Sequence, residues 1–145
     1  MGFSVTAAFA LLMIACLVAF GAVMAVLDTN LKAINAAEKQ QTRLKLEKAN
    51  TDFQIVSINA TNTTISTYDL QVVIYNDGST TLKTGDFSVL VDGVLENFTC
   101  NVSYLFPLKS ALISVTNLPG TVGSTHRLEI VSGNGVAKFA EYTVS

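Results

Sequence analysis

The sequence predicts an N-terminal transmembrane α-helix followed by an all-β, immunoglobulin-like sandwich of about seven strands. Two observations lead to this prediction. No charged side chain precedes Asp28, so residues 3–27 form one unbroken apolar run. From Thr51 onward, short segments rich in Val, Ile, Thr, Tyr and Phe alternate with turn residues, a pattern typical of sandwiches and barrels. We therefore expect three parts: a transmembrane helix (1–27), a helical stalk (28–50) and an extracytoplasmic β-sandwich domain (51–145).

The apolar run is long enough to cross a membrane. At about 1.5 Å rise per residue, residues 3–27 reach roughly 37 Å, against a hydrocarbon thickness of about 30 Å. A cleavable secretory signal has a basic segment ahead of a shorter apolar stretch, and residues 1–6 contain neither Lys nor Arg. We therefore expect the helix to be retained as an anchor.

The helical pattern continues beyond the apolar run. Residues 28–49 are rich in Ala and contain no Gly or Pro, and Asp28 and Lys32 are spaced for a helical ion pair. Some positions of this stretch, among them Leu31, Ile34 and Leu44, follow a spacing near 3.5 residues. Two interpretations stay open: a surface for a partner helix, and a solvated stalk.

Charge divides the chain into two unlike parts and bears on its partners. Residues 1–50 carry five cationic and three acidic side chains, a net charge of +2. Residues 51–145 carry four cationic and eight acidic side chains, a net charge of −4. A nucleic-acid site needs Lys and Arg clustered on one face, and this distribution argues against one. The cations that follow the apolar run would, by charge bias alone, place that flank in the cytoplasm.

Four glycosylation sequons oppose the charge bias. The candidate N-glycosylation sites are Asn59, Asn62, Asn97 and Asn101, each followed two residues later by Ser or Thr with no intervening Pro. Such acceptors are meaningful only on an exported surface. Because the charges that flank the apolar run are mixed in sign, we follow the sequons and expect the β domain to lie outside the cell membrane.

The β region resolves into short segments separated by turn signals. The expected strands are residues 52–59, 68–76, 87–91, 94–100, 111–116, 125–131 and 136–144. Asp92 and Gly93 form a dipeptide suited to a tight hairpin. Trp is absent and the two cysteines, Cys16 and Cys100, fall in different parts, so we expect the architecture without the antibody-type disulfide. An intermolecular bridge is the minor alternative.

No catalytic, cofactor or metal site is predicted. His126 is the only histidine, and its place beside Arg127 near a strand start suggests an exposed side chain. Asp86 and Asp92 lie on either side of an expected strand and could flank a cation, although aspartates at such positions more often form turns. Residues 132–135 (Ser-Gly-Asn-Gly) lie between strands and indicate a turn, since no helix follows to hold a phosphate.

Several segments, taken in order along the chain, resemble one known family. They are Met1-Gly2-Phe3-Ser4-Val5-Thr6, Ile74-Tyr-Asn-Asp-Gly-Ser-Thr-Thr-Leu82, Phe87-Ser-Val-Leu-Val-Asp-Gly93 and Ile130-Val-Ser-Gly-Asn-Gly-Val-Ala137. The chain resembles the accessory proteins F and G of the archaellum, the archaeal flagellum, which are related to archaellins and type IV pilins. The start, which lacks a basic leader peptide, looks like that of the F protein.

The resemblance implies a stator protein: embedded in the archaeal cytoplasmic membrane, with its sandwich binding the surface layer and the G-type partner, and without catalysis. Two other functions stay open. The chain could be an archaellin-like or pilin-like filament subunit whose helix lies in the filament core, or an extracytoplasmic sensor or carbohydrate-binding module. For surface-layer binding we expect a sandwich face or an edge strand, with the uncharged stretches 63–67 and 80–82, or the acidic turns at Asp77, Asp86 and Asp92, making the contact.

Overall fold

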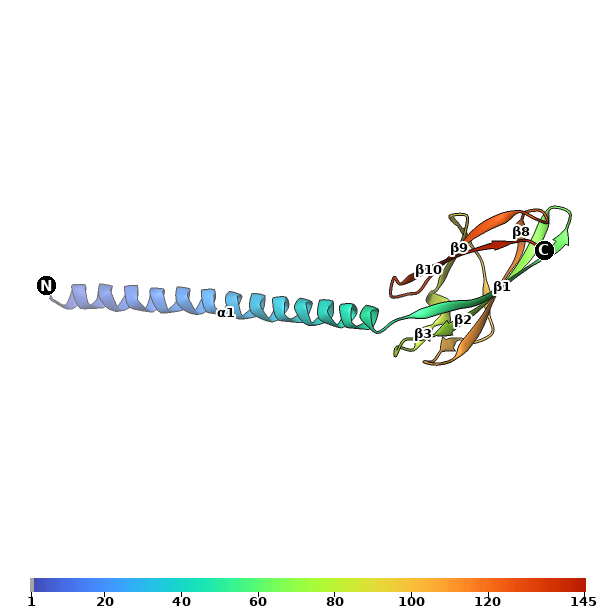
Figure 1. The fold of residues 1–145 in the computed structure, drawn as a ribbon. Coiled ribbons are helices and arrows are strands. Elements are labelled where there is room, and N and C mark those ends of the chain that lie inside the picture. Colours follow the sequence, from blue (N-terminus) through green and yellow to red (C-terminus); the bar gives the residue numbers. More distant parts are fainter. Residues whose placement is uncertain (1) are drawn as a thin grey trace. The chain divides into compact units, whose positions relative to one another are not determined.

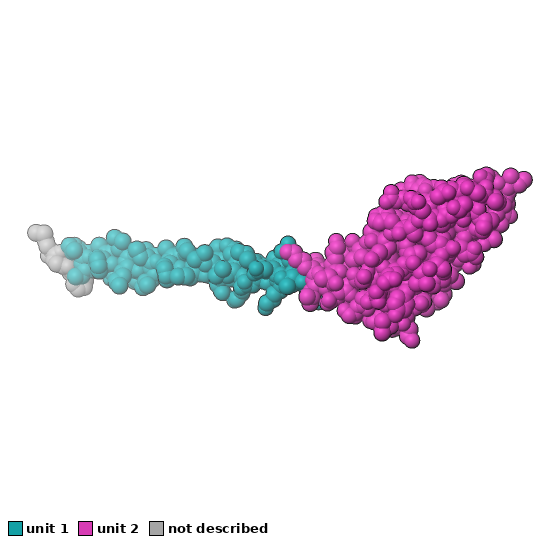
Figure 2. Space-filling view, in the orientation of Figure 1, with its two compact units in different colours: residues 1–43 teal, residues 44–145 magenta. Residues whose placement is uncertain are grey.

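A computed structural model describes residues 2–145, with side chains from Ser4 onward, and divides the chain into two compact units, residues 1–43 and 44–145 (Figures 1 and 2). The single helix, α1 (Gly2–Ala49), passes Leu27 without a break because no Gly or Pro follows to stop it. Its residues Ser4–Ala49 include a window of mean hydropathy 2.8, so the helix is long and apolar enough to cross a membrane. The expected ion pair forms, with Lys32 Nζ 2.7 Å from Asp28 Oδ2.

The second unit is an antiparallel β-sandwich (Figure 1). Its strands are β1 (Phe53–Thr64), β2 (Thr67–Asn76), β3 (Leu82–Lys83), β4 (Ser88–Val91), β5 (Val94–Glu96), β6 (Thr99–Cys100), β7 (Tyr104–Leu105), β8 (Ser110–Pro119), β9 (Thr125–Val131) and β10 (Ala137–Thr143). A 3₁₀ turn, η1 (Thr84–Asp86), follows β3. One sheet has the order β1-β2-β8-β6, the other β10-β9-β4-β5, and β3 pairs with β7. This is the strand arrangement of immunoglobulin-like sandwiches, as predicted.

The number of strands differs from the prediction: the described chain has ten, not about seven. We expected residues 94–100 to form one returning strand, and this was wrong. β5 pairs with β4 in one sheet, whereas β6 pairs with β8 in the other. The chain changes sheets between them, where Phe98 packs against the core. β3 and β7 were missed because each contains only two residues.

The core lies between the two sheets and is built entirely from residues of the second unit. Inward-facing side chains alternate with outward-facing ones along β2, β4, β8 and β9, as the period-two pattern requires. The largest fully buried side chains are Tyr68, Phe53, Leu70, Ile74, Leu105, Ile113, Leu118, Leu128 and Ile130. The sandwich therefore carries its own core, which is the requirement for independent folding.

One end of the sandwich, here called the proximal end, lies where the chain arrives from Asn50. The turn after β2 bonds to the arriving chain, with Ser79 N–H donating to Asn50 O (3.0 Å) and Gly78 N–H to Asp52 O (2.9 Å). The side chain of Asn76, fully buried, donates to Leu105 O (3.0 Å) and Thr80 O (2.9 Å). A single buried amide thus fixes the turns at this end.

The opposite end, here called the distal tip, consists of the β1–β2 turn (64–66) and the β8–β9 loop (120–124). Register places both there, because the first residue of β2, Thr67, pairs with the last residue of β8, Pro119. Gly120 N–H donates to Ser66 O (2.9 Å), which joins the two segments, and Gly123 N–H donates to Val144 O (2.9 Å). The distal tip is therefore tied both to itself and to the end of the last strand.

Candidate interaction site

The distal tip presents two apolar side chains to solvent on a fixed backbone. Ile65, in the β1–β2 turn, is 92% exposed, and Val122, in the β8–β9 loop, is 61% exposed. Since the backbone of each segment is hydrogen-bonded to the rest of the sandwich, little conformational freedom is left to lose on binding. An exposed and ordered pair of this kind is suited to contact with a protein surface.

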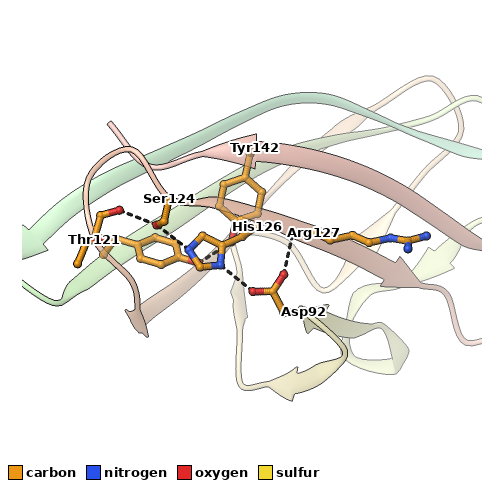
Figure 3. A network of polar contacts seen from close by, with 7 residues as sticks. Asp92, Thr121, Ser124, His126, Arg127 and Tyr142 are labelled. Carbon is orange, nitrogen blue, oxygen red and sulfur yellow. Dashed lines mark hydrogen bonds and ion pairs between the residues drawn. The ribbon is translucent and has the colours of Figure 1, made fainter.

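A polar network holds the β8–β9 loop to the β4–β5 turn (Figure 3). His126 Nδ1 lies 2.7 Å from Asp92 Oδ2, and the other carboxylate oxygen accepts the backbone N–H of Arg127 (2.8 Å). On its opposite side, His126 Nε2 lies 2.9 Å from Ser124 Oγ, which is also 2.5 Å from the carbonyl oxygen of Thr121. The backbone hydrogen bond to Arg127 and the hydrogen bond to His126 lower the pKa of the Asp92 carboxyl.

The acceptors of this network determine which of its atoms donate. The carbonyl of Thr121 can only accept, so it takes the single hydroxyl hydrogen of Ser124. Asp92, when ionised, also only accepts, so His126 Nδ1 donates to it. Ser124 Oγ keeps lone pairs that can accept a hydrogen bond from the imidazole.

Two tyrosines support the imidazole from within the core, and Figure 3 shows one of them, Tyr142, beside His126. The hydroxyls of Tyr68 and Tyr142 lie 2.7 Å apart, and the ring centroids of His126 lie 5.2 Å and 5.8 Å from those of Tyr68 and Tyr142. Burial raises the pKa of both hydroxyls above the ordinary tyrosine value. The network is thus anchored in the core on one side and reaches the surface at Asp92 on the other.

His126 was expected to be exposed, and this was wrong, because its side chain is only 13% exposed. The sequence could not show the burial, since Asp92 lies 34 residues away and Tyr68 belongs to the other sheet. The connectivity Ser124–His126–Asp92 is that of a hydrolase triad, but its surroundings are different. Ser124 Oγ faces a carbonyl oxygen, and a Cβ built on Gly120 would lie 2.8 Å from His126 Nε2, so backbone closely covers the imidazole. The geometry is that of a clamp between loops.

Each of the three acidic turns has a separate partner within the fold. Asp77 accepts a hydrogen bond from Gln54 (2.8 Å), Asp86 pairs with Lys83 (3.1 Å), and Asp92 belongs to the His126 network. The minor alternative, a cation between Asp86 and Asp92, is not supported, because each carboxylate has a separate partner within the fold. Among residues 2–145, no three His, Cys, Asp or Glu side chains gather in a way that could hold a metal ion.

The two uncharged stretches lie at opposite ends of the sandwich. Residues 63–67 include the β1–β2 turn of the distal tip, whereas residues 80–82 follow the turn that is bonded to Asn50 and Asp52 at the proximal end. The sequence suggested both as contact regions. A single docking event with one flat partner can involve only one of them.

One surface was missed by sequence reasoning. Leu95, Leu90, Glu129 and Phe139 stand side by side across β5, β4, β9 and β10 on the outer face of that sheet. Leu95 is 67% exposed and Phe139 is 54% exposed, with the guanidinium carbon of Arg127 5.0 Å from the Phe139 ring centroid. The available signal was an apolar residue at an outward position of β4, β5 and β10, but only register shows that these positions align with one another.

All four sequon asparagines have exposed side chains. Asn59 and Asn62 lie on β1, Asn97 lies between β5 and β6, and Asn101 follows β6. Asn101 differs from the others because its Oδ1 accepts the backbone N–H of Leu112 (2.8 Å). Cys16 and Cys100 are both free thiols.

No family model matches this sequence, and no curated protein does either. Solved structures do match, and three of them are structures of archaellum proteins with an antiparallel β-sandwich. The predicted resemblance is thereby confirmed at the level of the fold.

Two of these structures are stator proteins from Sulfolobus acidocaldarius. The archaellum periplasmic stator protein FlaG matches with a TM-score of 0.52 and 22% identity, covering 63% of this chain and 99% of that chain. The periplasmic stator complex of FlaF and FlaG matches with a TM-score of 0.51 and 21% identity, covering 62% of this chain and 87% of that chain.

The third is the archaeal flagellum of Methanospirillum hungatei. It matches with a TM-score of 0.66 and 18% identity, covering 89% of each chain. That coverage exceeds the sandwich alone, so part of α1 is included. At these identities the likenesses establish the fold of this chain.

Proposed function

We propose that this chain is a structural component of the archaellum: a membrane-anchored stator protein whose sandwich lies outside the cell membrane and binds the surface layer. The observation that supports this most directly is the likeness of the sandwich to the FlaG stator structure, of which 99% is covered. The solved FlaF and FlaG complex suggests a G-type accessory protein as the second partner. A stator needs a fixed end, a spacer and a stable binding domain, and no catalysis.

The N-terminal part of α1 supplies the fixed end. Its large apolar side chains are uncovered within the described chain, as Phe9 (71% exposed), Leu12 (66%) and Leu17 (64%) illustrate. In water this surface would drive aggregation, whereas bilayer hydrocarbon covers it. Residues 28–49 carry eight charged side chains and would serve as a solvated spacer. The four sequons support an exported sandwich.

The distal tip is the surface that we assign to surface-layer binding. Ile65 and Val122 are exposed, the backbone beneath them is hydrogen-bonded, and the His126 network fixes the β8–β9 loop. Residues 63–67 lie at this same end and are uncharged. The combination suits contact with a large ordered lattice through apolar anchors surrounded by hydroxyl groups.

The test is retention of purified surface-layer protein by the full chain in detergent micelles. Val122→Asp should weaken binding about tenfold or more, the loss expected for one anchor residue. Val56→Asp is the matched control, because Val56 is 62% exposed against 61% for Val122 and lies on β1 outside the distal tip. If Phe139→Asp alone abolished binding, the contact would lie on the outer face of the sheet that contains β10. If the folded wild-type chain retained no surface-layer protein, surface-layer binding would be removed from the proposed function.

A filament subunit is the second candidate, favoured by the coverage of 89% and TM-score of 0.66 with the archaeal flagellum structure. In that arrangement the apolar part of α1 would pack with other copies in a filament core, and the sandwiches would coat the outside. The two candidates differ in where the chain is found once filaments are detached from cells.

A further inference from the structure

A polar cleft lies at the proximal end of the sandwich, beside β3. Its volume is about 520 Å³, within the roughly 300 to 1,000 Å³ typical of ligand sites. It is lined by residues 80–83 and by Glu47, Asp86, Gly133 and Asn134, which all belong to the second unit. Within the described chain no residue of β7 lines the cleft, so the cleft runs along the edge of β3 that β7 does not cover.

The backbone of β3 turns hydrogen-bonding groups toward this open edge. Just beyond β3, Thr84 N–H donates to Ser103 O (3.1 Å), which continues the ladder with β7. Bonded and non-bonded pairs alternate in an antiparallel ladder, so the N–H and C=O of Lys83 point away from β7, and so do those of Thr81. Within the described chain β3 and β7 form a two-stranded sheet, so these groups have no further strand as a partner.

The lining residues that do not belong to β3 are held together by one buried hydroxyl. Thr51 is only 5% exposed, and its Oγ1 donates to Glu47 O (2.7 Å) and accepts from Asn134 Nδ2 (2.8 Å). A Cβ added at Gly133 would lie 2.9 Å from Asp86 Cβ, so the β9–β10 turn also packs against η1. The cleft is therefore formed before a ligand binds, which lowers the entropic cost of binding.

We infer that this cleft binds an extended, neutral or basic segment of a partner protein, which adds to the open edge of β3 as a further strand. The segment lies about 4.8 Å from β3 and bonds to the backbone N–H and C=O groups of Thr81 and Lys83. The inference does not depend on the surface-layer contact, which we assign to the distal tip.

The form of the cleft decides which kind of partner it accepts. The end of α1 and the β9–β10 turn stand beside the open edge, so the edge of another folded sheet, including that of a second copy, is kept from lying flat against β3. A single extended segment can enter. Two carboxylates, Glu47 and Asp86, against one ammonium group, Lys83, give the cleft a net negative charge, which disfavours an acidic segment.

The test uses a phage-displayed library of random short peptides, selected on the full chain in detergent micelles. Lys83→Pro removes the N–H that faces the cleft and puts a ring in its place. The fold can accept this change, because β7 does not use that N–H and the φ of Lys83 is −86°. Lys83→Ala is the matched control, since both variants lose the ion pair with Asp86 but Ala keeps the N–H.

The selected peptides should distinguish these two variants. We expect them to bind Lys83→Pro about tenfold more weakly than the wild type, or worse, because a backbone hydrogen bond is lost and the edge is blocked. They should bind Lys83→Ala within about threefold of the wild type, because an exposed ammonium group contributes little. Circular dichroism establishes that each variant is folded.

Amide hydrogen exchange of the wild type gives a measurement that needs no variant. A synthetic copy of a selected peptide should slow exchange at the N–H groups of Thr81 and Lys83 by about tenfold or more, because the added strand bonds to them. Exchange at Leu82 should stay the same, because its N–H faces β7. If Lys83→Pro fails to fold, this measurement alone decides.

Several results would overturn the inference. If no peptide were enriched, or if the peptides bound folded Lys83→Pro as tightly as the wild type, the cleft would not be a site of strand addition. Equal losses with Lys83→Pro and Lys83→Ala would mean that the peptides recognise the lysine side chain. Enrichment of acidic peptides would contradict the charge argument. Retention of surface-layer protein is measured separately, so failure here is distinguishable from failure of the proposed function.

Discussion

At the scale of single residues, the hydroxyl groups of Tyr68 and Tyr142 form a hydrogen bond within the core. Tyr68 is fully buried, so its hydroxyl has no access to water if its partner is lost. Tyr142→Phe should therefore lower the free energy of unfolding by about 1 to 3 kcal/mol, the cost of a buried unpaired hydroxyl. The double variant with Tyr68→Phe should lose less than the sum of the two single variants.

The same pair makes a prediction about alkaline pH. In the unfolded chain both phenols ionise near pH 10, whereas burial raises the pKa of both in the folded chain. Stability should therefore fall as the pH rises above about 10, and it should fall less in the double Phe variant. Urea unfolding followed by circular dichroism measures both effects. If the stability losses of the two single variants were additive, or if the wild type and the double variant lost stability equally at alkaline pH, the two hydroxyls would not be coupled.

Asp92 controls the other end of the same network. Asp92→Asn removes the charge opposite His126 and should lower the free energy of unfolding by about 1 kcal/mol at neutral pH, a modest loss because the carboxylate is half-exposed. Since the pKa of Asp92 is lowered on folding, its contribution is complete above about pH 4 and is lost as the pH falls through the folded value.

The Asp92→Asn variant should consequently lose less stability than the wild type on acidification. Glu141→Gln, at an exposed carboxylate on the adjacent strand β10, is the control and should titrate like the wild type. If the stability of Asp92→Asn and of the wild type fell alike on acidification, the Asp92 carboxylate would make no contribution to the free energy of unfolding.

None of these residue contacts could be predicted from the sequence. The sequence showed that Asp92 begins a tight turn, and its φ of +51° agrees with this. It did not show that the turn faces His126, because that contact depends on how β4 and β9 pair. Side chains that meet across a sheet are fixed by register, and register is decided by the whole sandwich.

At the scale of elements, the arriving chain and the β2–β3 turn are locked together at the proximal end. A Cβ added at Gly78 would lie 2.5 Å from Asp52 N and 2.6 Å from Asn50 O, both backbone atoms that cannot move aside easily. Gly78→Ala should therefore lower the free energy of unfolding by about 2 kcal/mol.

Gly85 provides the matched control for Gly78. It has no neighbour within 4 Å of an added Cβ, so Gly85→Ala should change stability by about 0.5 kcal/mol or less. Thermal unfolding of the two variants side by side measures the difference. Equal stability would show that the arriving chain is not held to the turn as described.

Most elements were predicted because their signals are local. The period-two alternation of β2, β4, β8 and β9 follows from burial of one face, and the length of the apolar part of α1 can be read directly from the absence of charged residues before Asp28. The division of residues 94–100 into β5 and β6 was not predicted. Nothing in a run of strand-forming residues shows that the chain crosses from one sheet to the other at Phe98.

At the scale of the whole molecule, a long apolar helix and a sandwich with its own core make a chain with two chemically different parts. The order of these parts and the sandwich architecture were predicted from composition and pattern, and the solved archaellum structures share the fold. The identity of the binding surface was not predictable. Exposure of Ile65 and Val122, and the alignment of Leu95 with Phe139, exist only in three dimensions.

The anchored stator and the filament subunit make opposite predictions about where the chain remains when filaments are removed. Cells of the source organism are sheared, filaments and membranes are separated by density, and the chain is quantified in each fraction with an antibody against the sandwich. An anchored stator stays with the membranes, resists high salt and is released by detergent. Recovery of the chain mainly in the sheared filaments would contradict the anchor and establish the filament subunit.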